Sequence, residues 1–96
     1  METLDDMRKS IDNIDNAIVA MFAERFKVTN RVGHYKAMND LPAKDESRES
    51  EQYARISSLA QQYDLDPEFA QSYLKSVISL VVTNHEEIAK NLSSTT

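Results

Sequence analysis

Two basic residues, Arg25 and Lys36, have the type and the spacing to hold a small anion. They lie eleven residues apart, which is close to three helical turns, so they share a helix face about 16 Å apart along its axis. A guanidinium cannot lose its charge, and Arg25 stands where the local repeat would place an apolar residue. Either this side chain reaches water, or the interior offers it an anion. Lys36 near a helix C-terminus is also favourable through the helix dipole alone.

The repeat interrupted by Arg25 is a line of apolar residues at alternating spacings of three and four, here called the apolar stripe. Its members are Leu4, Met7, Ile11, Ile14, Ile18, Met21, Val28, Val32 and Tyr35. The stripe predicts one helix over about 3–38, with Thr3 as its N-cap and a length of roughly 50 Å. A domain of this size has a radius of gyration of only ~13 Å. We therefore expect the stripe to face inward against a second chain, in a homodimer.

Two turn-forming clusters divide the rest of the chain. Asn39-Asp40-Leu41-Pro42 ends the first helix, and Asp64-Leu65-Asp66-Pro67 separates two more, with Asp66 as N-cap and Pro67 at the first helical position. The predicted helices run over about 45–63 and 67–92, followed by a frayed tail over 93–96. The sequence thus predicts an all-α fold, with residues 1–96 as a single domain.

Composition narrows the class of protein further. The chain has 96 residues, one Gly, two Pro, no Cys and a net charge of −5. It therefore forms no disulfides, and its acidity argues against nucleic acid as the main partner. No apolar run approaches the ~18 residues of a membrane span, and the first ten residues lack the apolar core of a signal peptide. We expect a protein of the cytoplasm without a membrane partner.

Charged residues gather on one face at the start of the second helix. Its apolar side is formed by Tyr53, Ile56, Leu59, Ala60 and Tyr63. Projected backwards by threes and fours, that side meets Asp45, Arg48, Glu49 and Gln52. These groups either face a common site with Arg25 and Lys36, or project past the core into solvent.

Three further residues need placing. His85 falls on the third helix within the apolar line of Leu74, Ile78, Val81 and Ile88, where a lone His is more often a core or edge residue than a ligand. His34 lies in another helix, and the spacing suggests no metal site. Arg8 lies about 25 Å before Arg25 along the first helix. Within one chain it cannot share a pocket with Arg25, so it is either solvated or directed at a partner's pocket.

Taken in order, these residues resemble the all-helical class of chorismate mutase. The resemblance spans about residues 4–90 and rests on the segments Arg8–Asp15, Ala23-Glu24-Arg25, Val32-Gly33-His34-Tyr35-Lys36, Pro42 and Asp45–Glu49. It implies an intertwined homodimeric bundle of three-helix chains, with the long first helices packed across each other. It also implies conversion of the dicarboxylate chorismate to prephenate by a [3,3] rearrangement without cofactor, metal or covalent intermediate.

The resemblance assigns a role to each site residue. Arg25 and Arg8 of the partner subunit hold the two carboxylates, and Lys36 donates to the ether oxygen. Glu49 accepts from the ring hydroxyl with the Asp45 backbone nearby, and Arg48 adds to the electrostatics. Val81 stands where some members have Ser.

His85 stands where the family often has Gln or Glu against the ether oxygen. We expect it to face that oxygen and to work best protonated, giving higher turnover at mildly acidic pH. The alternative is that it lies at the pocket edge without a catalytic part.

Two other functions fit the same pattern. A related branch of the fold splits isochorismate into pyruvate and salicylate, although the Asp45-x-x-Arg48-Glu49 set favours the mutase. The second alternative is a non-catalytic helical dimerisation or regulatory module. Intact Arg25 and Lys36 count against a decayed site.

Overall fold

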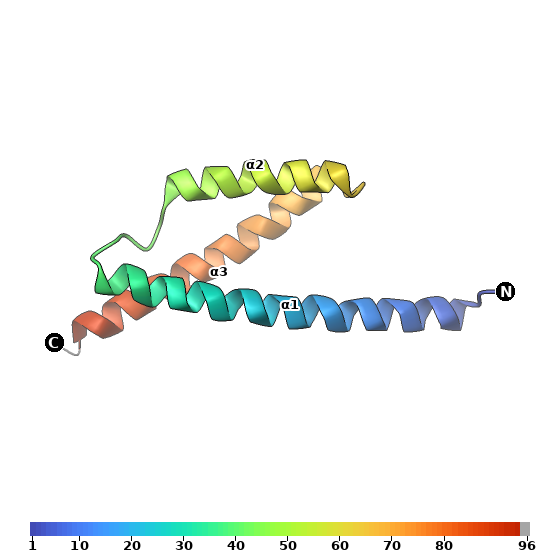
Figure 1. Cartoon of the computed structure of the whole chain (residues 1–96), viewed down its shortest axis with the longest axis horizontal. Coiled ribbons are helices and arrows are strands. Elements are labelled where there is room, and N and C mark those ends of the chain that lie inside the picture. Colours follow the sequence, from blue (N-terminus) through green and yellow to red (C-terminus); the bar gives the residue numbers. More distant parts are fainter. Residues whose placement is uncertain (95–96) are drawn as a thin grey trace.

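The chain consists of three helices in a computed structural model that describes the backbone of residues 1–94 and the side chains of residues 1–92. They are α1 (Leu4–Met38), α2 (Glu46–Gln62) and α3 (Pro67–Ser94) (Figure 1). The all-α prediction is confirmed, and the helix ends lie within two residues of the predicted ones. Of the expected frayed tail, residues 93 and 94 continue α3, whereas residues 95 and 96 lie outside the described residues.

Side-chain caps set where each helix begins. Thr3 and Asp6 form a reciprocal capping box, in which each side chain accepts from the other's backbone N–H at 3.1 Å. Asp45 Oδ1 accepts from the backbone N–H of Arg48 at 3.0 Å. This cap starts α2 at Glu46 and places Arg48 and Glu49 in its first turn.

The turn after α1 brings the connecting segment back over the helix. Asp40 adopts a left-handed conformation with φ of 55°, and the N–H of Leu41 donates to the Lys36 carbonyl at 2.8 Å. The same arrangement ends α2, where Asp64 has φ of 56° and Leu65 donates to the Ala60 carbonyl. The turn after α1 leads to Ala43, whose carbonyl accepts a hydrogen bond from Lys36 Nζ at 3.0 Å.

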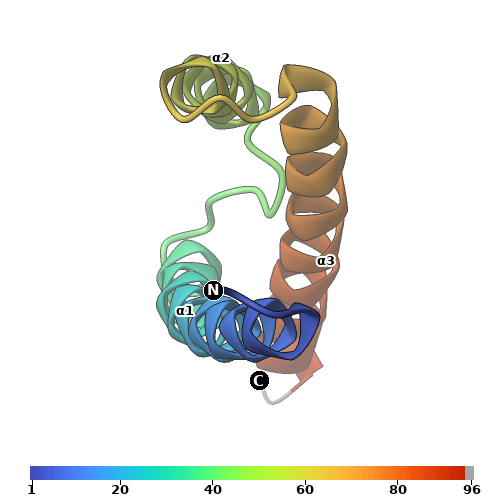
Figure 2. The same ribbon diagram turned by 90° about the vertical axis from the view of Figure 1, so that its right-hand side faces the viewer.

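Helix α3 is the centre of the packing. It contacts both α1 and α2, whereas α1 and α2 lie apart and do not pack on each other within the described residues (Figure 2). The buried residues follow α3 and the small residues that face it: Gly33, Ala60, Ala70, Leu74, Val77, Ile78 and His85. The prediction that Tyr63 faces inward is wrong. It is the C-cap of α2, where the chain already turns away, and it is 73% exposed.

The apolar stripe is not a buried face of the single chain. Its members are 42–67% exposed, and every residue from 1 to 21 is exposed. The side of α1 that meets α3 carries Phe22, Phe26, Thr29 and Gly33 instead, because the two helices cross only over the C-terminal half of α1 (Figure 1). The remaining half extends away from α3, giving a radius of gyration of 17.4 Å. Among the described residues, no helix has the length and apolar character to cross a membrane.

Candidate active site

A small cavity of about 60 Å³ lies where α1, the α1–α2 connection, α2 and α3 come together. Six of the eight predicted site residues line it: Arg25, Lys36, Asp45, Arg48, Glu49 and Val81. The fold therefore brings the charged start of α2 to the same place as the two α1 cations, although Asp45 and Arg48 stay exposed to solvent. The other two predicted residues, Arg8 and His85, lie elsewhere.

Arg25 stands at the border between this cavity and a much larger apolar groove. Its side chain is half-buried, and among the described residues it forms no hydrogen bond or ion pair. The groove measures about 690 Å³ and is lined by residues of the apolar stripe together with Phe22 and Tyr73. Burial raises the pKa of the Tyr73 hydroxyl, and the positive charge of Arg25 opposes this rise. A half-buried guanidinium without a partner is available to an anion entering from either side.

Lys36 is held only by neutral acceptors. Its Nζ donates to the Ala43 carbonyl at 3.0 Å and lies 3.3 Å from His85 Nδ1. An ammonium has three N–H donors, so one remains for a ligand. Its positive charge is not neutralised by either contact.

The two carboxylates that line the cavity have other partners. Asp45 caps α2 through Oδ1. Glu49 is held by Lys44, whose Nζ lies 3.2 Å from Oε1 and 3.3 Å from Oε2. Arg48 likewise turns to the surface, where Nη1 pairs with Glu51 Oε2 at 3.1 Å. Among the described residues, the charges of the lining without an ion-pair partner are therefore the cations of Arg25 and Lys36 and the carboxylate of Asp45, so the positive charges are in excess.

His85 is not among the residues that line this cavity, and its direct contact with the substrate's ether oxygen remains a prediction. The imidazole is only 3% exposed and packs between α3 and α1, behind Lys36. Its Nε2 lies 2.7 Å from the Thr29 carbonyl oxygen, and its Nδ1 faces Lys36 Nζ. Both ring nitrogens are thus already engaged, because the third helix packs tightly enough on α1 to bring the ring against its backbone.

Arg8 lies on the exposed N-terminal half of α1, away from the cavity of its own chain. This agrees with the helical spacing, which separates it from Arg25 by about 25 Å. The contribution of Arg8 to the substrate site of a partner subunit remains a prediction.

Sequence reasoning also missed several residues of the site. The cavity wall is completed by Thr29, Ala43, Gln52, Ile78 and Val82. Thr29 follows Arg25 by four residues, so the helical repeat already placed it on the same face. Gln52 had been assigned to the correct face of α2 without a role. Ala43 contributes its backbone carbonyl, for which no side-chain pattern gives a signal.

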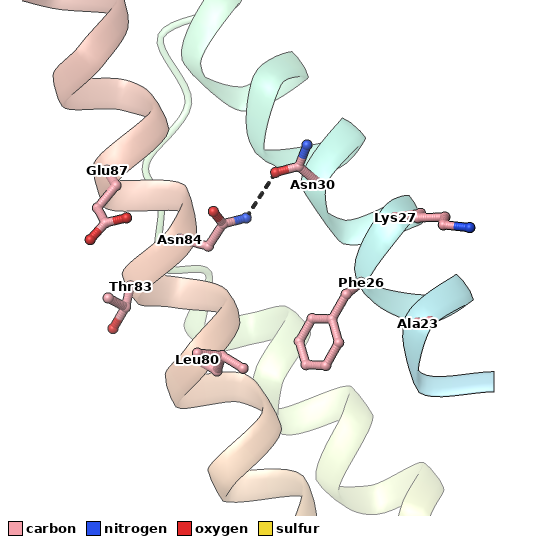
Figure 3. A pocket seen from close by; sticks show the side chains of 8 residues that line it. All are labelled: Ala23, Phe26, Lys27, Asn30, Leu80, Thr83, Asn84 and Glu87. Carbon is pink, nitrogen blue, oxygen red and sulfur yellow. Dashed lines mark hydrogen bonds between the residues drawn. The ribbon is translucent and has the colours of Figure 1, made fainter. Parts of the chain in front are cut away.

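A second pocket lies between α1 and α3 and measures about 560 Å³ (Figure 3). Asn84 Nδ2 donates to Asn30 Oδ1 across it at 3.1 Å, while Phe26 and Leu80 supply apolar surface. Its one cation, Lys27, points outward and pairs with Glu24 at 2.9 Å. This pocket therefore lacks the pair of uncompensated cations. Nowhere in the described part of the chain do three or more His, Asp or Glu residues gather as metal ligands.

The fold and the site together define an all-helical protein with two basic α1 residues, Arg25 and Lys36, in the lining of one cavity. A family model described as chorismate mutase type II matches residues 7–86, and the chain belongs to this family.

Two relatives agree with this assignment. The chain is 36% identical over 66 residues to the chorismate mutase of Methanocaldococcus jannaschii, covering 69% of this chain and 67% of that protein. It is 39% identical over 59 residues to the bifunctional chorismate mutase/prephenate dehydratase of Aquifex aeolicus. That match covers 62% of this chain but only 16% of the larger protein.

Proposed function

We propose that this protein is a chorismate mutase, an isomerase that converts chorismate to prephenate. One observation carries the proposal: Arg25 and Lys36 line the same cavity, and neither meets a carboxylate among the described residues. Chorismate brings two carboxylates and an ether oxygen, which are the groups such cations bind. Family membership makes this small dicarboxylate the natural ligand.

The reaction suits a site of this kind. In the rearrangement one C–O bond breaks as one C–C bond forms, so no nucleophile or proton transfer is required. Catalysis then depends on folding the enolpyruvyl arm over the ring and on positive charge at the ether oxygen, where electron density grows. Arg25 binds a carboxylate. The remaining N–H of Lys36 donates a hydrogen bond to the ether oxygen and so brings positive charge close to it. A rate gain of ~10⁶ requires roughly 8 kcal/mol.

The other lining residues complete the proposed site. Glu49 accepts a hydrogen bond from the ring hydroxyl, with the Asp45 backbone close by. Arg48 adds positive potential, and it can exchange its surface partner Glu51 for a ligand carboxylate. Val81 supplies an apolar wall, which excludes water and strengthens the electrostatic interactions beside it.

We further propose that the functional unit is an intertwined homodimer in the cytoplasm, with residues 1–96 as one domain. The cavity of about 60 Å³ is far smaller than the ~300 Å³ at which ligand pockets begin. The apolar stripe and the adjoining groove of about 690 Å³ are exposed in the single chain. A second α1 laid along them buries this surface, encloses the site and delivers Arg8 of the partner subunit to the ligand.

The test is an ultraviolet assay of chorismate disappearance by the full chain and by Arg25→Ala. We expect turnover by the parent and its near-complete loss in Arg25→Ala, with the dimer preserved in sedimentation. Arg31→Ala is the matched control, because Arg31 is an exposed α1 arginine away from the cavity. Salicylate fluorescence from isochorismate would indicate the lyase instead. A parent dimer without turnover of either substrate would indicate a non-catalytic module.

A further inference from the structure

We propose that His85 is a positioning residue: in its neutral form, protonated at Nε2, it holds the Lys36 ammonium in place at the cavity. Its effect on catalysis rests on the proposed chorismate mutase function, whereas the arrangement of the two side chains does not. This assignment replaces a direct contact with the substrate by action through Lys36.

The partners of the ring decide its protonation state. A carbonyl oxygen only accepts, so Nε2, at 2.7 Å from the Thr29 carbonyl, must carry the proton. An ammonium only donates, so Nδ1, at 3.3 Å from Lys36 Nζ, must offer its lone pair. Both conditions are met together by one neutral tautomer. The buried ring, 3% exposed, has no room to exchange these partners for water.

Gly33, the only glycine of the chain, leaves the space in which the His85 ring lies against α1. A Cβ built on Gly33 would lie 2.6 Å from His85 Cδ2 and 3.1 Å from its Nε2. Those distances are too short for a methyl group, so the imidazole rests directly against the α1 backbone. Gly33 lies between Thr29 and Lys36, one turn from each. The ring can thus reach the carbonyl of one and the ammonium of the other.

His85 fixes the direction of a flexible side chain. Lys36 carries its charge on a four-carbon stem and would otherwise sample many rotamers. The Ala43 carbonyl and His85 Nδ1 hold two of its three N–H groups. The third is thereby directed toward the position proposed for the ether oxygen. Such orientation in advance of binding is what electrostatic catalysis requires.

This arrangement requires an unprotonated Nδ1, whereas the direct contact expected from the sequence called for a protonated ring. Protonation at Nδ1 would set an N–H against the Lys36 ammonium at the same 3.3 Å and drive the two apart. The charged groups of the adjoining cavity are Arg25 from α1 and Arg48 and Glu49 from α2. Glu86 on its own helix and His34 on α1 are exposed. Positioning of Lys36 through this contact therefore requires the neutral ring.

The kinetic test compares His85→Gln with His85→Phe between pH 5 and 8. His85→Phe keeps a ring but loses both hydrogen bonds, and we expect kcat to fall about 10- to 100-fold while KM changes little. His85→Gln keeps an acceptor and a donor, so it should retain most of the parent's kcat. His34→Gln, which changes an exposed histidine on α1, should keep the parent's kcat and KM. An unaffected His85→Phe, or a His85→Gln that is as slow as His85→Phe, would overturn the proposal.

A second measurement needs no substrate. In ¹⁵N correlation spectra of the full chain at pH 8, His85 should show a protonated Nε2 and an unprotonated Nδ1, and the Nδ1 resonance should shift in Lys36→Met. A protonated Nδ1, or no shift, refutes the positioning role even if chorismate turns over. The expected spectra in a protein without chorismate turnover would support the His85–Lys36 arrangement and refute the proposed function instead.

Discussion

Lys44 Nζ lies 3.2 Å from Oε1 and 3.3 Å from Oε2 of Glu49, so that one ammonium holds both oxygens of the carboxylate. The Glu49 side chain is 17% exposed and that of Lys44 54%, which makes the contact a partly desolvated ion pair. Glu49 lines the candidate active site as well as a neighbouring groove between α2 and α3. Lys44 therefore sets the direction from which Glu49 meets a ligand hydroxyl.

Replacing Lys44 by Met should weaken substrate binding without unfolding the chain. Ion pairs near a surface contribute up to about 1 kcal/mol, so we expect KM for chorismate to rise by at most about fivefold. Lys9→Met is the matched control, since Lys9 pairs with Asp5 at 3.9 Å far from the cavity and both side chains are well exposed. Steady-state kinetics of the two variants measure the difference. Equal KM values would show that Glu49 needs no such support.

Gly33→Ala should destabilise the chain, against the usual preference of helices. An exposed glycine in a helix costs up to about 1 kcal/mol relative to alanine, so helix propensity alone predicts stabilisation. Here the added methyl meets His85 Cδ2 at 2.6 Å and Ile88 Cδ1 at 2.9 Å. We expect the free energy of unfolding to fall by about 1–3 kcal/mol, measured by urea denaturation.

A double-mutant cycle identifies the cause. In a His85→Ala background the ring is absent, and Gly33→Ala should then cost much less, because the Ile88 methyl can move aside. Equal penalties in both backgrounds would mean that the ring is not what excludes a side chain at position 33.

Mixing two inactive variants should restore activity if Arg8 of one chain serves the site of the other. In a two-fold dimer of Arg8→Ala with Arg25→Ala, one site contains both intact arginines and the other contains neither. Random exchange makes half of the dimers mixed, so the mixture should regain about a quarter of the parent activity. The assay follows chorismate turnover after refolding the two variants together. Mixed dimers that form without activity would place Arg8 outside the site.

Stability at high pH should depend on Tyr73. Burial raises the pKa of its hydroxyl above the ordinary value of 10.0, with Arg25 opposing the rise. Above pH 10 the unfolded chain then loses this proton more readily than the folded chain does, so stability falls as the pH rises through the folded-state pKa. Urea midpoints between pH 9 and 11 should decline less steeply in Tyr73→Phe than in the parent. If the urea midpoints of the two proteins decline equally, ionisation of Tyr73 does not contribute to the loss of stability.

The sequence by itself determined the three helices and much of the site. Apolar spacing and the predicted caps Thr3 and Asp66 depend on contacts within one or two turns, so the helix ends were predictable to within two residues. The same periodicity put Arg25 and Lys36 on one face of α1, and the charged residues on one face of α2.

Only the tertiary structure decided which surfaces meet. The apolar stripe is predicted to face a second chain, whereas within the chain α3 packs on Phe22, Phe26 and Gly33, because helix crossing depends on how side chains of both helices fit together. The helical repeat places His85 on the apolar side of α3, but it does not reveal that its partners are a backbone carbonyl and a side chain of α1. A helical repeat fixes the direction in which a side chain points around the helix axis. The groups that it contacts in that direction depend on how the neighbouring helix packs.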